Sequence, residues 1–516
     1  MNRKKAIIIG KHPLEESLKQ QYETLQMDVS HFADDNTLPS KSEMNDCDEL
    51  FVLTDPSKKQ DEDIDSKAIA ILGLLADKID ADALKGRRII CHLMLQSMRA
   101  LQHLRTNDFC APIKQLMDVY PFTMGEVWSR SIDLDYVPIT IQSEQHAHLV
   151  IFGMNDIAYM VAIHATETAH YPNYVRDHSK RTRITLVDEH ACSKYAELIQ
   201  RYPCLFDNSY YRVVAPSDDN PVKLFHKPIY ADLREDFVDV EWEFVEASLW
   251  NEELRDKLRM WATDPRQLLT VVIANDDGNR NLSEAMHLPD EMFRENIPIH
   301  VYSQRGFALS HCPNIHYFGM LDNGYDVLLP HVRMAKNVNY IYDCCYHDNY
   351  ENWSGHMYYT VEMDADVCEQ LWKQLSNLKR MSCICNAMTI PTKMRSIGLM
   401  QNEWDKFYDI SQNDIETLAQ VEHNRWCLEA LVQNFRPCTE SEQQIIEDDI
   451  SQKKVMKQRK IHYDLRAYSD LRPDETGKSV QIYDICLCSC LPLIVKDFAD
   501  KNQEFETTGN SKGGES

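Results

Sequence analysis

Short apolar runs rich in β-branched residues recur through the first 320 residues, and most end at a glycine or an acidic residue before a helical stretch. The run at residues 5–9 ends at Gly10, and the run at 148–152 ends at Gly153. Runs of this length suit buried parallel strands, and strands that alternate with helices imply a parallel sheet with helices on both faces. The pattern therefore predicts an α/β protein built on two Rossmann-like parallel sheets.

The predicted strands fall into two groups, and helical patterns follow them. The first group predicts an N-terminal Rossmann-like domain over residues 1–135, and the second predicts another α/β domain over residues 140–310. From about residue 311 the strand pattern gives way to helices. The remaining parts are expected to be a helical connecting region, a mostly helical C-terminal module and a flexible tail, at residues 311–415, 416–500 and 501–516.

The turn after the first predicted strand is poor in glycine. Gly10 is followed by Lys11, His12 and Pro13, where a phosphate-binding loop has further glycines that let the backbone approach pyrophosphate. We therefore expect the N-terminal domain to be structural or to dock a partner, and ligand binding by this domain is the less favoured alternative.

Charge and composition exclude several classes of function. The 516 residues carry a net charge of −26, which repels nucleic acid and anionic lipid surfaces at long range. No segment approaches the roughly 20 apolar residues of a membrane helix, so no membrane insertion is expected. The 16 cysteines follow no disulfide framework or paired zinc spacing, as expected of reduced thiols in a cytoplasmic protein without a metal site.

The strand ends of the second domain carry polar side chains suited to a nucleotide. Gly153 ends one strand, Asn155 and Asp156 open the next helix, and Asp188 ends the following strand. A carboxylate at that point accepts two ribose hydroxyls and repels a 2′-phosphate. Of the three glycines of the dinucleotide fingerprint, only the first is present, and Ala158 stands at the third.

Residues 269–285 read Leu-Thr-Val-Val-Ile-Ala-Asn-Asp-Asp-Gly-Asn-Arg-Asn-Leu-Ser-Glu-Ala. This segment resembles the TrkA-N type of nucleotide-binding domain, and the resemblance covers about residues 140–310. It implies NAD or a related adenine nucleotide as cofactor, a homo-oligomer, and regulation of a partner effector protein. The ligand-binding residues that it implies are Gly153, Asn155, Asp156, Asp188, Asn275 and Asp276.

The C-terminal part carries a second pattern. It reads Glu-His-Asn-Arg-Trp at residues 422–426 and His-Tyr-Asp-Leu at 462–465, and Lys478, Tyr483 and Asp484 follow. These blocks resemble the RyR domain, a small helical module, over about residues 335–495. Asn434-Phe435-Arg436 departs from the Gly-Trp-Arg of that family.

The RyR-like module is expected to bind a nucleotide-type ligand. Arginines can make bidentate contacts to phosphate, a tryptophan offers a stacking face, and histidines donate hydrogen bonds. The predicted ligand-binding residues are Glu422, His423, Arg425, Trp426, Arg436, His462 and Tyr468. The alternative is that Glu422 and Arg425 form an internal ion pair and that Trp426 belongs to the core.

An aromatic cluster at residues 340–359 could suggest base stacking. The acidity of the chain and the lack of interleaved arginine favour a place in the core or at a domain interface. Its members are Tyr340, Tyr342, Tyr346, Tyr350, Trp353, Tyr358 and Tyr359.

No Walker loop, G-x-S-x-G, H-E-x-x-H or other nucleophile motif is present, which favours binding over catalysis. The leading hypothesis is a cytoplasmic nucleotide-binding sensor or regulatory protein. Two alternatives stay open. One is an enzyme that hydrolyses or modifies a nucleotide signal, for example in antiphage defence, since a lone carboxylate such as Asp156 or Glu422 leaves no pattern as a general base. The other is a structural adaptor that binds no ligand.

Overall fold

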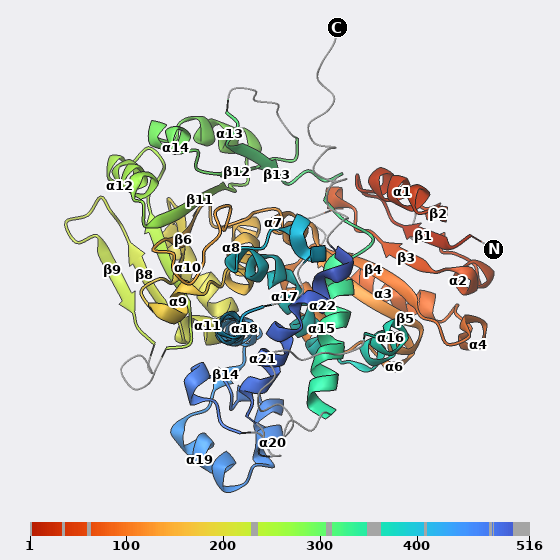
Figure 1. Cartoon of the computed structure of the whole chain (residues 1–516). Coiled ribbons are helices and arrows are strands. Elements are labelled where there is room, and N and C mark those ends of the chain that lie inside the picture. Colours follow the sequence, from red (N-terminus) through yellow and green to blue (C-terminus); the bar gives the residue numbers. More distant parts are fainter. Residues whose placement is uncertain are drawn as a thin grey trace.

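A computed structural model of the chain describes residues 3–33, 37–58, 63–228, 236–305, 312–322, 324–347, 363–406, 410–473, 477 and 479–498. Two parallel sheets and a layer of helices between them form most of this structure (Figure 1). The expected α/β architecture with a helical C-terminal part is therefore confirmed. The tail at residues 501–516 and Lys478 lie outside the described residues.

The first sheet has five parallel strands in the order β2-β1-β3-β4-β5. Its strands are β1 (Lys5–Ile9), β2 (Asp28–Phe32), β3 (Glu49–Val52), β4 (Ile89–Leu95) and β5 (Met117–Thr123). Its helices are α1 (Glu15–Thr24), α2 (Lys41–Asp46), α3 (Ile64–Ala76), α4 (Ala81–Leu84), α5 (Met98–Thr106), α6 (Ala111–Leu116) and α7 (Met124–Ser129). This 2-1-3-4-5 order is the flavodoxin-like variant of the doubly wound fold.

The second sheet has the order β13-β12-β11-β6-β7-β10-β8-β9, and only the β8–β9 pair is antiparallel. Its strands are β6 (His146–Phe152), β7 (Thr182–Asp188), β8 (Tyr210–Val214), β9 (Val222–His226), β10 (Val240–Glu246), β11 (Gln267–Ile273), β12 (Ile299–Tyr302) and β13 (Ile315–Phe318). Its helices are α8 (Asp156–Thr168), α9 (Asn173–Arg176), α10 (Ala191–Arg201), α11 (Pro203–Asp207), α12 (Glu252–Thr263), α13 (Gly278–Met286) and α14 (Asp290–Arg294).

Six strands of the second sheet follow the Rossmann order 3-2-1-4-5-6, which is β10-β7-β6-β11-β12-β13 here, and the β8–β9 hairpin extends the β10 edge. The sheet reaches Phe318 because β13 pairs with β12. The sheet thus extends past the domain boundary expected at residue 310, and its last strand lies where the sequence indicates a late edge strand. The order reverses between β6 and β11, and ligands of such sheets bind at this switch point.

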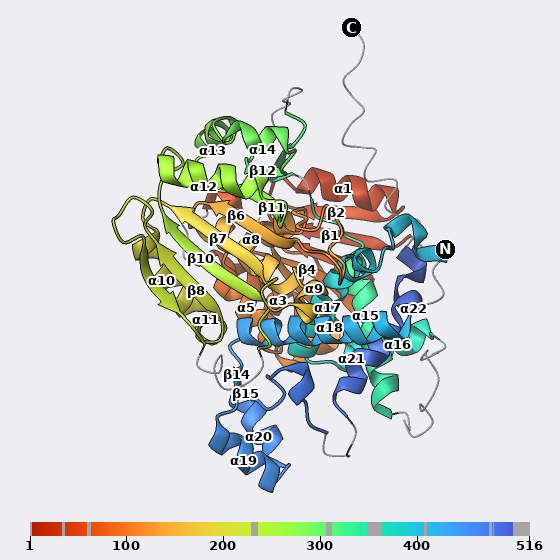
Figure 2. The same cartoon turned by 60° about the vertical axis from the view of Figure 1, so that its left-hand side comes forward.

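The C-terminal helices form one layer between the two sheets (Figures 1 and 2). The layer consists of α15 (Pro330–His347), α16 (Ala365–Gln374), α17 (Asn377–Ser396), α18 (Gln412–Val432), α21 (Gln481–Ser489) and α22 (Leu491–Val495). Helix α17 packs against α5 of the first domain and α8 of the second, while α18 packs against α8, α11 and α17. The segments expected to divide near residue 415 therefore share one core.

A small lobe extends from the end of α18 (Figure 2). It contains α19 (Glu440–Asp448), α20 (Gln452–Gln458) and the two-stranded pairing of β14 (Arg436–Pro437) with β15 (Ile461–His462). Its own apolar cluster is formed by Ile446, Met456, Ile461 and Tyr463.

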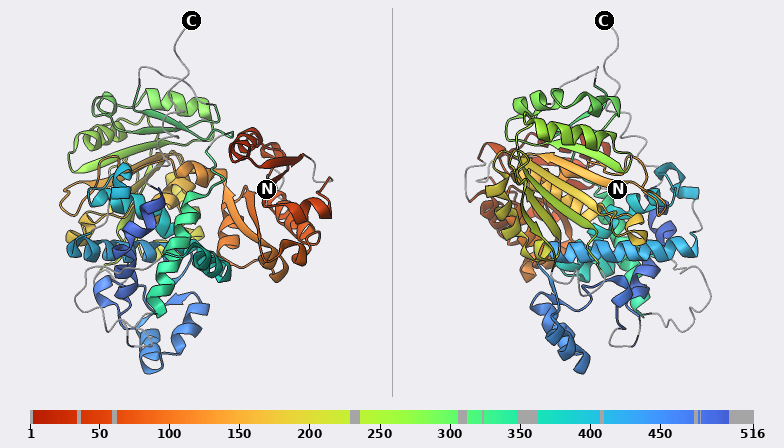
Figure 3. Two further views of the ribbon diagram at one scale, coloured as in Figure 1. Left: turned by 45° about the vertical axis from the view of Figure 1, so that its right-hand side comes forward. Right: turned by 90° about the vertical axis from the view of Figure 1, so that its left-hand side faces the viewer.

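The first sheet lies apart from the second, as the left view of Figure 3 shows, and one of its faces is closed by other parts of the chain. The Tyr325 ring lies 4.2 Å from Phe122 and 5.1 Å from Phe51, measured between ring centroids, and its hydroxyl lies 2.8 Å from Nδ1 of His92. The first domain thus docks onto the rest of this chain through a buried aromatic contact.

Candidate functional site

The switch point between β6 and β11 opens into a pocket of about 290 Å³, which we call the switch-point crevice. Five of the six residues predicted from the second domain line it, namely Gly153, Asn155, Asp188, Asn275 and Asp276. The other polar residues in its lining are Glu189, His190, Lys194, Ser248, Asp277, Arg280 and Glu284. Residues from distant parts of the chain meet here because the carboxyl ends of parallel strands share one edge of a sheet.

Gly153 lets two neighbouring strand ends approach closely. Its φ is +108°, and a Cβ at this position would lie 2.8 Å from the Ala274 carbonyl oxygen. Asn155 then caps α8, because its Oδ1 accepts from the Ala158 amide at 3.0 Å while its Nδ2 donates to Ala274 O and Asp276 Oδ1. The amide side chain thus fixes the turn where the fingerprint has its second glycine.

Asp188 holds the loops on both sides of the crevice. Its carboxylate accepts the Met154 amide at 3.1 Å and the His190 amide at 2.8 Å, and it pairs with Lys194 Nζ at 2.7 Å. The side chain keeps 11% of its surface exposed, so the carboxylate edge still reaches the crevice. A bound ribose would share this carboxylate with the two amides.

On the β11 side, Asn275 Nδ2 donates to Glu284 at 2.8 Å, and its backbone amide donates to Asn281 at 2.9 Å. Arg280 pairs with Glu284 at 2.7 Å and with Glu189 at 2.9 Å. Asp156, the remaining predicted residue, does not line the crevice and pairs with Arg201 at 2.9 Å.

The charge of the switch-point crevice is negative. Its lining holds five carboxylates and two basic residues, and both basic residues already pair with carboxylates of the lining. Phosphate oxygens would meet repulsion there, although the amino end of α8 offers amide hydrogens and a favourable dipole. Hydroxyl groups, which donate hydrogen bonds, suit the lining better than phosphates do.

A second pocket of about 610 Å³ lies beside α18, and we call it the α18 cleft. His423 and Trp426 line it, together with aromatic and acidic side chains that sequence patterns did not place there. These are Tyr342, Tyr346, Tyr483, Asp343, Asp464 and Asp484. Tyr346 was expected in a core or interface, but it is 54% exposed and contributes to the cleft wall. Tyr350, Trp353, Tyr358 and Tyr359 lie outside the described residues.

Glu422 and Arg425 do not reach the α18 cleft. Arg425 donates from Nε and Nη2 to Glu422 at 2.9–3.0 Å and from Nη1 to Glu429 at 2.7 Å, and both Glu422 and Arg425 are at most 1% exposed. The ligand role expected for these two residues does not fit this burial, and they form an internal ion pair instead. The Arg425 and Lys393 charges hold the pKa of Glu422 at about 2 against the opposing effect of burial.

Three other predicted residues, Arg436, His462 and Tyr468, do not line the cleft. Arg436 pairs with both oxygens of Glu442 at 2.7 Å, so its guanidinium is committed within the small lobe. The His462 ring packs edge-on to Trp426 at 4.8 Å, and the Tyr468 ring lies 5.8 Å from His423. His462 and Tyr468 thus position the rings that form the cleft wall.

Burial changes the protonation behaviour of two groups that line the α18 cleft, His423 and Asp484. His423 Nε2 lies 2.7 Å from the Arg466 carbonyl, which can only accept, so Nε2 carries the proton and Nδ1 is left as an acceptor. Burial lowers the pKa of His423, and burial next to Glu422 raises the pKa of Asp484 well above its usual value. A neutral heterocycle that stacks on Trp426 would meet both donors and acceptors there.

Sequence reasoning missed Lys194, Arg280 and Glu284 in the crevice. They lie on α10 and α13, one or two turns beyond the strand ends, where no spacing rule singles them out. It also missed Asp464 and Asp484 as members of a cleft, although both belong to the RyR-like motif.

Among the described residues, no three His, Cys, Asp or Glu side chains gather in a way that could hold a metal ion. The part of the chain that the structure describes also has no helix with the length and apolarity needed to span a bilayer.

The chain matches no protein-family model and no curated protein. The resemblances to TrkA-N and RyR domains therefore stay predictions. Among solved structures, the chain is similar to the apo-structure of D-lactate dehydrogenase from Escherichia coli, at 14% identity and a TM-score of 0.18, over 63% of this chain and 91% of that chain. A likeness at this TM-score carries no argument about function.

Proposed function

We propose that this protein is a nucleotide-binding regulatory protein whose second α/β domain binds NAD or a related adenine nucleotide in the switch-point crevice. The observation that supports this most is the position of Asp188. It ends the second strand of a sheet with the Rossmann order, next to the amino end of α8 and on the wall of a pocket of about 290 Å³. A carboxylate at this point is the one that accepts ribose hydroxyls in dinucleotide folds.

The charge of the crevice refines the expected ligand. Ribose hydroxyls would donate to Asp188, while phosphates would have to approach the amino end of α8 against the net negative lining. Adenosine should therefore bind nearly as well as AMP or ADP, and a 2′-phosphate should be rejected. In a Rossmann site whose amide groups bind the phosphates, each added phosphate increases the affinity. Similar affinities for adenosine, AMP and ADP would therefore distinguish the switch-point crevice from such a site.

The α18 cleft supports a second ligand contact. Its volume of about 610 Å³, the Trp426 face and the His423 ring with its free acceptor nitrogen suit a stacked heterocycle of a nucleotide-type ligand. The α18 cleft is thus the second proposed binding site, for a nucleotide-type ligand. In this proposal, ligand binding changes the association of the chain with itself or with an effector protein.

Calorimetric titration of the full chain with NAD, adenosine, AMP and ADP tests the proposal. We expect saturable binding of NAD, and adenosine within about threefold of ADP, because added phosphates gain little in an acidic pocket. Asp256→Asn, at an exposed carboxylate on α12, is the matched control and should leave these affinities unchanged. Chromatography of the same mixtures for new products separates binding from hydrolysis, and absence of all binding would support an adaptor instead.

A further inference from the structure

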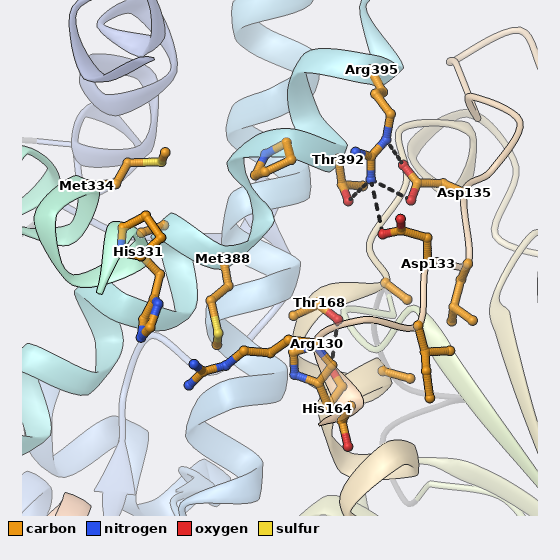
Figure 4. Close-up of a pocket in the computed structure, with 18 of the residues that line it drawn as sticks. Arg130, Asp133, Asp135, His164, Thr168, His331, Met334, Met388, Thr392 and Arg395 are labelled. Carbon is orange, nitrogen blue, oxygen red and sulfur yellow. Dashed lines mark hydrogen bonds and ion pairs between the residues drawn. The ribbon is translucent and has the colours of Figure 1, made fainter. Parts of the chain in front are cut away.

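A third cavity of about 310 Å³ lies where the first domain, the second domain and the helical layer meet, and we call it the junction cavity (Figure 4). It is lined from α7 and the segment that follows it, from α8, from α15 and the segment before it, and from α17, η4 (Gln401–Lys406) and η6 (Lys496–Phe498). None of the ligand-binding residues expected from the sequence lies in its lining. The cavity is thus distinct from both nucleotide sites proposed above.

Most of the wall of the junction cavity is apolar. Met334 of α15 and Met388 of α17 stand on one side (Figure 4), and Val161 of α8 also belongs to the lining. Further apolar members of the lining are Ile132, Leu134, Leu328, Trp404 and Phe498. A volume of this size is at the lower end of known small-molecule sites, which cover roughly 300–1,000 Å³. The walls suit a compact apolar body.

One end of the cavity carries excess positive charge. Arg130 donates Nη2 to Glu126 at 2.7 Å, and Arg105 donates to the same Glu126 oxygen at 2.5 Å, so two guanidiniums share one carboxylate. Figure 4 shows the Arg130 side chain pointing along the cavity toward His331, with His164 at the same end. The two other charged residues of this part of the lining, Asp326 and Arg333, have opposite charges, so an anionic group here would meet two guanidiniums that share the single carboxylate of Glu126.

The two histidines at this end are neutral hydrogen-bonding groups. Burial, together with the positive charge of Arg130, lowers the pKa of His164 to about 4 and that of His331 well below its usual value. A neutral imidazole offers one N–H donor and one acceptor nitrogen. Beside Arg130, these rings can each donate to an oxygen of a bound acid.

The opposite end of the cavity is closed by a complete ion pair. Arg395 of α17 donates to both oxygens of Asp135 at 2.7 and 2.8 Å, and its Nη2 lies 3.9 Å from Asp133 (Figure 4). One guanidinium thus faces two carboxylates, so this end has no unpaired positive charge to offer an anion. The cavity thus has an end with two guanidiniums, apolar walls in between, and an opposite end whose single guanidinium is fully paired with carboxylates.

We propose that the junction cavity binds a small amphipathic monocarboxylic acid, with its carboxylate at Arg130, His164 and His331 and its apolar body between Met334 and Met388. A ligand in this place touches all three parts of the chain at once, so it favours the arrangement in which they are packed together. The site does not depend on nucleotide binding in the switch-point crevice.

Titration calorimetry of the full chain with octanoate, 1-octanol and octylammonium tests this proposal, because the three probes share an apolar body and differ in the head group. Octanoate should bind at least roughly tenfold more tightly than the other two, as expected for a charge-assisted contact. Equal affinity for the three probes, or no heat from octanoate up to its solubility limit, would overturn the proposal.

Two substitutions locate the binding. Arg130→Gln keeps Glu126 paired with Arg105 and should reduce octanoate affinity to that of 1-octanol. Met388→Trp fills the cavity and should abolish binding of octanoate, whereas Met260→Trp, at a methionine on α12 that is 58% exposed, should not. Met334→Phe narrows the cavity from α15 and replaces Met388→Trp if that variant does not fold. Octanoate affinity that is unchanged in Arg130→Gln and in the filled variant would contradict the site.

Discussion

Lys393 on α17 donates to the Glu422 carboxylate on α18 at 2.6 Å, and both side chains are at most 1% exposed. Glu422 also accepts from Arg425, which reaches Glu429 in turn. Glu422 and Arg425, which the sequence patterns predicted to bind a ligand, are thus part of a buried network. This network joins α17 and α18, the two longest described helices of the helical layer. Its role is in the stability and register of α17 and α18.

Lys393→Met should destabilise the protein by about 3 kcal/mol, because removing one partner of a buried ion pair leaves the other charge poorly compensated. Lys336→Met is the matched control, since Lys336 pairs with Glu369 at partly exposed positions and should cost less than about 1 kcal/mol. Urea unfolding followed by circular dichroism measures both. An equal loss in the free energy of unfolding in the two variants would show that the buried ion pair stabilises the protein no more than the partly exposed one.

Gly153→Ala should destabilise the protein by about 2 kcal/mol. An alanine is strained at a backbone φ of +108°, and its Cβ would lie 2.8 Å from the Ala274 carbonyl oxygen. Gly73→Ala on α3 is the control. A Cβ there meets nothing within 4 Å, and an alanine in a helix should raise stability by up to about 1 kcal/mol. Thermal unfolding of both variants distinguishes a required glycine from an incidental one.

Tyr325→Phe should cost about 1 kcal/mol through loss of the hydroxyl contact with His92, while Tyr325→Ala should cost about 4 kcal/mol through loss of the ring. The ring packs between Phe51 and Phe122, so its removal also loosens the first domain. Limited proteolysis should then release the first domain from Tyr325→Ala and not from Tyr325→Phe. Release from both variants, or from neither, would contradict this docking contact.

Stability should fall as the pH is lowered from about 6.5 to 4. Burial lowers the pKa of several histidines, so the unfolded chain takes up protons that the folded protein refuses, and stability is lost as pH falls through the usual histidine pKa. The pKa is lowered to about 4 in His12, His146 and His164, to about 3 in His300 and His462, and well below 6.5 in His148 and His331.

Four carboxyls act in the opposite direction. Burial raises the pKa of Glu167 to about 7, that of Asp484 well above 3.8, and those of Asp133 and Asp326 above 3.8, so these groups add stability as the pH falls from 7 toward 4.5. They are fewer than the buried histidines, and the net effect remains a loss. The urea concentration at the unfolding midpoint should therefore be lower at pH 5 than at pH 7. An equal or higher midpoint at pH 5 would contradict this expectation, because it would mean that protonation of the histidines does not destabilise the folded protein.

The α/β class and several strand positions could be predicted, because β1, β6 and β7 are apolar runs that end at or next to Gly10, Gly153 and Asp188. The buried strands β5 and β10 were not predicted, since polar residues interrupt their apolar ones. The 2-1-3-4-5 order of the first sheet could not be predicted, since strand order depends on where each crossover helix packs and leaves no local pattern. The crevice residues Gly153, Asn155, Asp188 and Asn275 could be predicted because strand ends of one sheet converge.

The buried network around Arg425 was less predictable. A Glu-x-x-Arg spacing on one helix is compatible with a ligand site and with an internal ion pair, and only the packing of α17, which brings Lys393, decides between them. The junction cavity left no sequence signal at all. Its polar groups Arg130, His164, His331 and Arg395 come from four separate segments that only the docking of all three parts brings together.

The most direct test of the proposed function is the affinity of the full chain for NAD and NADP, measured by calorimetry on the wild type and on Asp188→Asn. We expect NAD to bind roughly tenfold more tightly than NADP in the wild type, because the Asp188 carboxylate accepts the ribose hydroxyls and repels a 2′-phosphate. In Asp188→Asn, NAD affinity should fall and the ratio between the two should approach about one. Equal affinities in the wild type, or a ratio that the substitution leaves unchanged in a folded variant, would contradict a ribose bound at Asp188.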